Sequence, residues 1–192
     1  AWRYDFGYLA LAYKLGEGDF GELLFAPQES DMTSQNQLDK VTKLESVYGA
    51  SSQAGFGSAV FYELLKQDDN LEQMALEKYK YFVGDLWERY GEDAWMGPWK
   101  QVYARQTGTK YDIITELRGI QDTDAANSVP MILDNIEGAD QARAALSFVY
   151  DDPTVTDLQV FNLGDGGAMS GLLIAGRYDK TGEAIFLVFL LD

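Results

Sequence analysis

The residues with the clearest chemical potential in this sequence are carboxylates in its polar stretches. A hard cation such as calcium is bound by six to eight oxygen ligands, and acidic loops supply them. Five carboxylates are candidates for such a site: Asp122, Asp124, Asp151, Asp152 and Asp165. None of their stretches matches the D-x-[DN]-x-[DN]-G loop with its distant Glu. Calcium is therefore one alternative for this chain, and we predict no other cofactor.

The same carboxylates also have structural interpretations. Asp122 and Asp124 in "QDTDAAN" have the position of a helix N-cap, where a carboxylate accepts hydrogen bonds from free backbone N–H groups. Asp151 and Asp152 follow a helical pattern and precede Pro153, as residues that bound a turn do. We prefer these interpretations to metal binding.

The chain contains no cysteine and no histidine. Thiolate nucleophiles, zinc sites of the Cys/His kind, Ser-His-Asp relays and histidine acid–base catalysis are therefore excluded. A small enzyme would have to use paired carboxylates, as glycoside hydrolases do, together with Tyr or Lys. No such pair stands out, so we predict no catalytic residue, and the enzyme interpretation remains an alternative.

The charge balance gives the strongest compositional signal. The chain has 31 acidic and 15 basic residues, for a formal net charge of -16. Such a field repels phosphate backbones and anionic lipid surfaces, so we expect neither nucleic-acid binding nor membrane insertion, and we expect a basic protein partner. The alternative is that the charge serves solubility alone. The sequence does not indicate an oligomeric state.

A group of acidic and aromatic residues in "GEDAWMGPWK" is our candidate for protein binding. It consists of Glu92, Asp93, Trp95 and Trp99. Two tryptophans this close together form either an exposed anchor or the cover of a core. We prefer the core, because apolar aromatic surface is costly to leave in water.

The elements that would position these residues differ between the two parts of the chain. We expect helices over residues 6–15, from near Leu38 to Tyr48, over "AVFYELLK" (59–66), over 71–90, from Pro98 to about Arg105, and over "ADQARAALSFVY". Residues 22–27, "ELLFAP", are expected to be extended, and "QESDMTSQNQ" (28–37) to be a surface loop.

The last third of the chain is typical of strands. "VTDLQVFNL", "AMSGLLIAGRY" and "EAIFLVFLL" are β-type runs, and the last two lack clean alternation, which indicates strands covered on both faces. The glycine-rich "LGDGGAMSG" fails the G-x-G-x-x-G spacing and precedes a strand, so we predict a hairpin connection with glycines at positive φ and no phosphate site.

These patterns predict an α+β fold, in which a helix-rich N-terminal two-thirds packs on a C-terminal antiparallel β-meander. We expect a single layered domain over residues 1–192, with a helical insertion at about 38–106 and the meander at about 155–191. The start of the chain lacks the pattern of a signal peptide, and no apolar run is long enough to span a bilayer, so we expect a cytoplasmic protein.

Both ends of the chain resemble the nuclease A inhibitor family of cyanobacteria. The similar segments are "GELLFAPQES" (Gly21 to Ser30), "ADQARAALSFVY", "VFNLGD" and "LLIAG". The resemblance implies an acidic α/β/α-type domain that binds and blocks a nuclease. This chain differs by the insertion from about Leu38 to Gln106 and by the apolar end "FLVFLLD", and no functional residue is carried over.

Together these observations favour a non-catalytic acidic protein-binding domain that inhibits or regulates a basic partner. Three alternatives stay open: a calcium-binding acidic protein, a structural or assembly subunit, and a small carboxylate-based enzyme.

Overall fold

A computed structural model describes residues 29–66, 68–106, 108, 110–179 and 181–192 of the chain. The chain divides into two units, residues 1–39 and 40–192, and the fold described here is that of the second. The expectations for residues 6–15 and 22–27 lie outside the described residues, and the single-domain organisation stays a prediction.

The order of elements mixes helices and strands before the meander begins. It is α1 (Glu29–Tyr48), β1 (Gly57–Leu64), α2 (Leu71–Val83), α3 (Asp85–Tyr90), α4 (Glu92–Met96), β2 (Lys100–Ala104), α5 (Ile113–Arg118), α6 (Thr123–Leu133), α7 (Ala139–Tyr150), β3 (Val155–Gly164), β4 (Ser170–Tyr178) and β5 (Glu183–Leu191). Among the described helices, none is long and apolar enough to cross a membrane.

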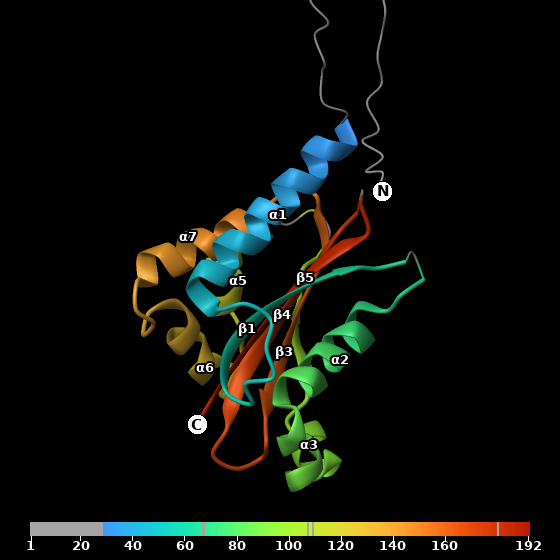
Figure 1. Ribbon diagram of the computed structural model, residues 1–192. Coiled ribbons are helices and arrows are strands. Elements are labelled where there is room, and N and C mark those ends of the chain that lie inside the picture. The colour runs from blue at the N-terminus through green and yellow to red at the C-terminus, as the bar shows by residue number, and fades with distance from the viewer. Residues whose placement is uncertain (1–28, 67, 107, 109, 180) are drawn as a thin grey trace, which may run out of the picture. The chain divides into compact units, whose positions relative to one another are not determined.

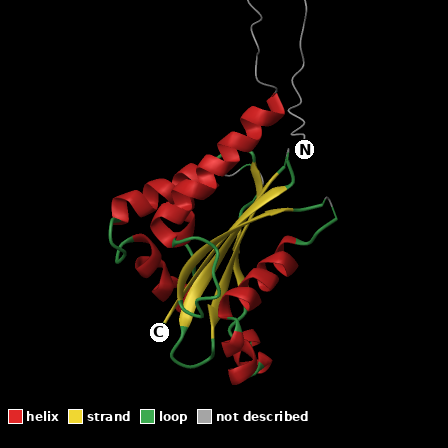
Figure 2. Cartoon of the chain, in the orientation of Figure 1, coloured by secondary structure: helices red, strands yellow, loops and turns green. Residues whose placement is uncertain are grey.

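A single antiparallel sheet with the strand order β1-β5-β4-β3-β2 forms the middle layer (Figures 1 and 2). The meander β3-β4-β5 is at its centre, which confirms the predicted α+β fold with an antiparallel C-terminal meander. β1 and β2 extend the sheet on its two sides.

Helices cover both faces of the sheet (Figure 1). On one face, α5, α6, α7 and the part of α1 from Lys40 onward pack on side chains such as Ile174 and Leu187. On the other face, α2 and Trp95 of α4 pack on side chains such as Leu173 and Phe186. Successive strand residues therefore enter opposite cores, which explains why the apolar runs of β4 and β5 lack alternation.

Four predicted elements were wrong. The helix expected over 71–90 is interrupted at Gly84, which separates α2 from α3. Residues 59–66 were expected to be helical, but they belong mostly to β1, which pairs with β5 from Gly57↔Leu190 to Leu64↔Glu183. The helix expected from Pro98 to Arg105 is instead the edge strand β2. The insertion at 38–106 is thus not purely helical. α1 begins at Glu29 and not near Leu38, because the stretch from Glu29 to Gln37 contains neither Gly nor Pro to stop a helix.

The connection between β3 and β4 is a hairpin loop, as predicted. Gly164 has a φ of 153° and Gly166 a φ of 72°, values that side-chain-bearing residues rarely adopt. A Cβ atom on Gly164 would also lie 2.5 Å from the carbonyl oxygen of Met169. The glycines therefore permit the chain reversal.

Candidate functional site

Three chain segments meet where β3 turns into β4, and we call this region the hairpin end. They are the β3–β4 loop (165–169), the turn between α4 and β2 (97–99), and the start of α6 (122–125). β2 lies beside β3 with Lys100 opposite Asn162, and the Lys100 ammonium is 2.5 Å from the Asp122 carboxylate, which joins the start of α6 to the sheet. The loop approaches α4, since a Cβ on Gly166 would lie 3.8 Å from the carbonyl oxygen of Ala94.

Asp122 is the N-cap of α6, as the structural interpretation predicted. Its carboxylate accepts a hydrogen bond of 3.0 Å from the backbone N–H of Ala125. The hydrogen bond from Lys100, followed by that from Ala125, lowers the pKa of Asp122, and the same contact raises the pKa of Lys100. Each group thus holds the other in its charged form.

Asp165 organises the hairpin loop. Its Oδ1 accepts hydrogen bonds from the backbone N–H groups of Gly167, at 2.8 Å, and Met169, at 3.0 Å. These contacts fix the loop from within, as an Asx turn does. The carboxylate carries its negative charge at the hairpin end without a cation partner in the described part of the chain.

A pocket of about 290 Å³ opens between the loop and α6. Its apolar walls come from Pro98, Leu163 and Met169, and its polar groups include Asp124, Asn127 and Asn162. Asp124, which was predicted as a possible metal ligand, is thus exposed at the rim of a pocket and does not cap the helix.

Asn162 gives this pocket an unusual acceptor. The side chain is only 2% exposed, and its Nδ2 donates to the carbonyl oxygen of Pro98 at 3.2 Å. Its Oδ1 is buried and has no hydrogen-bond partner among the described residues. Leaving such an acceptor unpaired costs about 1–3 kcal/mol. A polar ligand donor at this position would remove that cost.

The tryptophans confirm the core interpretation. Trp95 is fully buried, donates its indole N–H to the carbonyl oxygen of Leu86 at 3.1 Å, and stacks on Trp87 at a centroid distance of 6.0 Å. Trp95 therefore belongs to the core, as preferred, and a protein-binding role for it stays a prediction. Trp99 is half-buried and stacks on Phe161 at 4.7 Å. Both side chains pack in the same apolar cluster as Phe161 and Leu163 of β3.

The two acidic candidates of α4 are exposed. Glu92 forms an exposed ion pair with Lys80 at 2.8 Å. Asp93 is exposed beside it and forms no ion pair in the described part of the structure. They continue a series of exposed carboxylates on α2 and α3: Glu72, Glu77, Asp85 and Glu88.

The remaining two metal candidates, Asp151 and Asp152, lie at the opposite end of β3, which we call the network end. Asp151 accepts a hydrogen bond of 2.6 Å from the backbone N–H of Ile113, and burial raises the pKa of its carboxyl group. Asp152 pairs with the buried Lys40 at 2.6 Å. Burial acts to raise the pKa of Asp152, but the hydrogen bonds from Lys40 and Thr154 outweigh it, so the pKa is lowered.

The network end contains a second ion pair, between Arg105 and Glu116. The Arg105 guanidinium contacts both carboxylate oxygens of Glu116, at 2.8 and 2.6 Å, and also donates to the carbonyl oxygen of Tyr150 at 2.8 Å. Its Nη2 is 3.9 Å from Asp151. Arg105 and Glu116 hold the end of β2, α5 and α7 together, and Lys40 of α1 pairs with Asp152 after α7. The predicted metal candidates thus divide between two ends of the sheet, and the described residues contain no group of three or more acidic side chains placed to share a metal ion.

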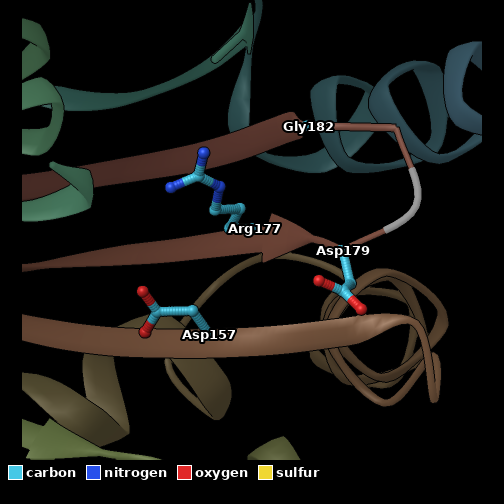
Figure 3. Close-up of a pocket in the computed structure, with 4 residues that line it drawn as sticks. All are labelled: Asp157, Arg177, Asp179 and Gly182. Atoms are coloured by element: carbon cyan, nitrogen blue, oxygen red, sulfur yellow. The ribbon is translucent and has the colours of Figure 1, made fainter. Parts of the chain in front are cut away.

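A separate cavity of about 470 Å³ lies near the turn between β4 and β5. Figure 3 shows that Asp157 of β3 and Asp179 after β4 line it, while the Arg177 guanidinium is directed away from both carboxylates. That guanidinium donates to the backbone carbonyls of Lys66 and Asp69. Arg177 therefore anchors the connection before α2.

Analysis of the sequence missed Asn162, Arg105 and Glu116. One signal was available for Asn162: it is an amide within the otherwise apolar "VFNLG" run of a strand that was predicted to be covered on both faces. No comparable signal links Arg105 to Glu116, because their contact depends on β2 and on the placement of α5 against it.

Comparison of the chain with models of protein families, with curated proteins and with solved structures finds no match. The resemblance to the nuclease A inhibitor family stays a prediction.

Proposed function

We propose that the protein is a non-catalytic acidic binding domain that inhibits or regulates a basic protein partner, and that the hairpin end is its contact surface. One observation carries this proposal. Two described cations near this surface, Lys80 and Lys100, are already paired with Glu92 and Asp122. The carboxylates of Asp93, Asp124 and Asp165 form no ion pair in the described part of the chain, so they remain available to a basic surface.

The excess of negative charge supports this proposal. With a formal net charge of -16, the protein attracts a basic partner over distances of about 10 Å at 0.1 M salt, the range set by ionic screening. Complementary charge accelerates association and excludes acidic competitors. The exposed carboxylates of α2, α3 and α4 extend that field beside the hairpin end.

The surface is also rigidly supported. Tyr79 of α2 donates its hydroxyl to the carbonyl oxygen of Gly164 at 3.0 Å and stacks on Trp99 at a centroid distance of 5.7 Å. Burial raises the pKa of Tyr79 far above the physiological range, so the hydroxyl remains a donor. A contact surface fixed in this way loses little conformational entropy on binding.

A defined basic probe tests the proposal. A deca-arginine peptide is titrated into the labelled protein at 50 and 300 mM salt, and backbone NMR shifts are followed. We expect the largest shifts in residues 92–99, 122–127 and 165–170, and an affinity that falls at least tenfold at the higher salt concentration.

Matched charge variants provide the control. The triple variant Asp93→Asn/Asp124→Asn/Asp165→Asn should weaken peptide binding more than Asp68→Asn/Asp157→Asn/Asp179→Asn, which removes the same charge elsewhere. Equal effects of the two triple variants, or shifts centred outside the hairpin end, would contradict the proposed surface.

A structural or assembly role is the second candidate, because apolar side chains are exposed along β1 and α2. Phe56 is 63% exposed, Leu64 66% and Tyr81 52%. Exposed apolar side chains indicate an interface with another chain where they form one continuous surface. Sedimentation of the wild type and of Leu64→Lys tests it: a concentration-dependent oligomer that the substitution abolishes would support assembly, and a monomer at all concentrations would count against self-assembly.

A further inference from the structure

We propose that the pocket at the hairpin end receives one arginine or lysine side chain of the basic partner. This inference rests on the proposed function and names the anchor by which the partner is held. The occupant is defined by its chemistry: a long side chain with an apolar stem and a cationic head that only donates hydrogen bonds.

Asn162 lines the pocket, and its buried side-chain oxygen is an acceptor that lacks a donor among the described residues. Asn162 is only 2% exposed, and its Nδ2 donates a hydrogen bond to the carbonyl oxygen of Pro98. This bond fixes the orientation of the amide, so Oδ1 is the atom left without a partner in the described structure. A guanidinium or ammonium donor completes its hydrogen bonding, whereas an acceptor ligand would oppose it.

The walls and the rim match the other parts of such a side chain. Pro98, Leu163 and Met169 offer apolar contact to the methylene stem, and the Asp124 carboxylate at the rim offers the counter-charge. A volume of about 290 Å³ lies just below the range for small-molecule sites, about 300–1,000 Å³, and suits one side chain.

The surrounding charge favours a cation. The nearby Lys100 is neutralised by Asp122, and the positive end of α6 is capped by the same carboxylate. Asp165 adds negative charge in the adjoining loop. Asp124 is the single carboxylate among the described lining residues, whereas calcium sites combine several carboxylates with other oxygen ligands. This set of ligands therefore favours an organic cation over calcium.

A peptide with a single cationic side chain separates binding in the pocket from general attraction to the negative charge of the protein. The probe is acetyl-Gly-Gly-Arg-Gly-Gly-amide, compared with the same peptide carrying lysine and with its neutral citrulline analogue, which keeps the shape of arginine. NMR titration follows the Asn162 side-chain amide and the backbone amides of Gly166 and Gly167. We expect saturable shifts with arginine or lysine and at least tenfold weaker binding of the citrulline peptide.

Two variants and one control define the site. Asn162→Leu keeps every charge and should reduce affinity for the peptide about tenfold, as expected for a lost hydrogen bond to a charged group. Asp124→Asn, at an exposed position, should reduce it several-fold without any effect on folding. Asp179→Asn removes the same charge at the other end of the sheet. It should weaken the binding of the peptide only by the small amount expected from the lower net negative charge.

The outcomes separate this inference from the proposed function. If deca-arginine binds the hairpin end while the monovalent peptides bind Asn162→Leu and the wild type equally, the pocket inference is wrong and the proposed function stands. If deca-arginine does not bind the hairpin end at all, both are wrong. Calcium chloride that shifts the same resonances at sub-millimolar concentration, with no response to the arginine or lysine peptides, would also overturn the inference in favour of a metal site.

Discussion

The two ends of the sheet bury polar groups to a similar degree but use them differently. At the network end, the side chain of Arg105 is 3% exposed and that of Glu116 8%, and two hydrogen bonds join them. At the hairpin end, Asn162 is 2% exposed and its side-chain oxygen has no hydrogen-bond partner among the described residues. Burial alone therefore does not distinguish a structural polar group from one that is available for binding, whereas the state of its hydrogen bonding does.

The difference also explains why acidic residues of similar sequence context have different roles. Asp151 and Asp152 are held by Ile113 and Lys40 and connect α7 to its neighbours. Asp124 and Asp165 keep their charge at the surface, because the cation nearest to them is taken by Asp122. Removing charge should therefore destabilise the network end and weaken binding at the hairpin end.

The largest effect is expected for Glu116→Leu. This substitution leaves the buried Arg105 without its carboxylate, and breaking a buried pair in this way costs about 3–5 kcal/mol of the free energy of unfolding. The measurement is urea unfolding followed by circular dichroism. The double variant Arg105→Met/Glu116→Leu is the control and should be more stable than Glu116→Leu alone, because no buried charge is left unpaired. A single variant as stable as the wild type would show that the network end does not depend on this pair.

A smaller effect is expected for Asp152→Asn, about 1.5–3 kcal/mol at pH 7, because Lys40 loses its charged acceptor. The pKa of Asp152 is lower in the folded protein, so its contribution is present above the unfolded value of about 3.9 and is lost as the pH falls through the folded value. The gap in unfolding free energy between wild type and variant should therefore narrow from pH 6 to pH 3. A gap that stays constant over this range would contradict the ion pair as its cause.

The smallest effect is expected for Asn162→Leu at the hairpin end, within about 1 kcal/mol of wild-type stability. The variant loses the hydrogen bond to Pro98 but also removes the unpaired Oδ1, and these two changes oppose each other. Urea unfolding under the same conditions as for Glu116→Leu provides the measurement. A loss as large as that of Glu116→Leu would place Asn162 among the structural groups and remove the contrast between the two ends.

The sequence predicted the centre of the sheet better than its edges. β3, β4 and β5 follow from dense apolar runs joined by short turns, and neighbouring strands pair with one another. β1 contains Ala59, Val60 and Phe61 in succession, all buried because both faces of the sheet are covered, so no alternation marked it as a strand. Residues 57–64 form a strand because they pair with β5, which is far away in the sequence, and no local sequence pattern indicates that pairing.

The site was predicted in part. The N-cap role of Asp122 follows from local geometry and was confirmed. The separation of Asp151 and Asp152 from the other three candidates depends on the direction in which β3 crosses the sheet. The orientation of the Asn162 amide, which leaves Oδ1 without a partner among the described residues, depends on the bond from Nδ2 to the carbonyl oxygen of Pro98. That bond forms only because β2 lies beside β3.

The position of β1 in the strand order has a consequence for synthesis on the ribosome. Leu64 pairs with Glu183 and Gly57 with Leu190, so β1 has no strand partner until β5 has been made. The core between α2 and the sheet includes Phe61 of β1 and Phe186 of β5, so it is also incomplete until β5 has been made. We therefore expect the nascent chain to expose an incomplete apolar layer until β5 has been made and can pair with both β4 and β1.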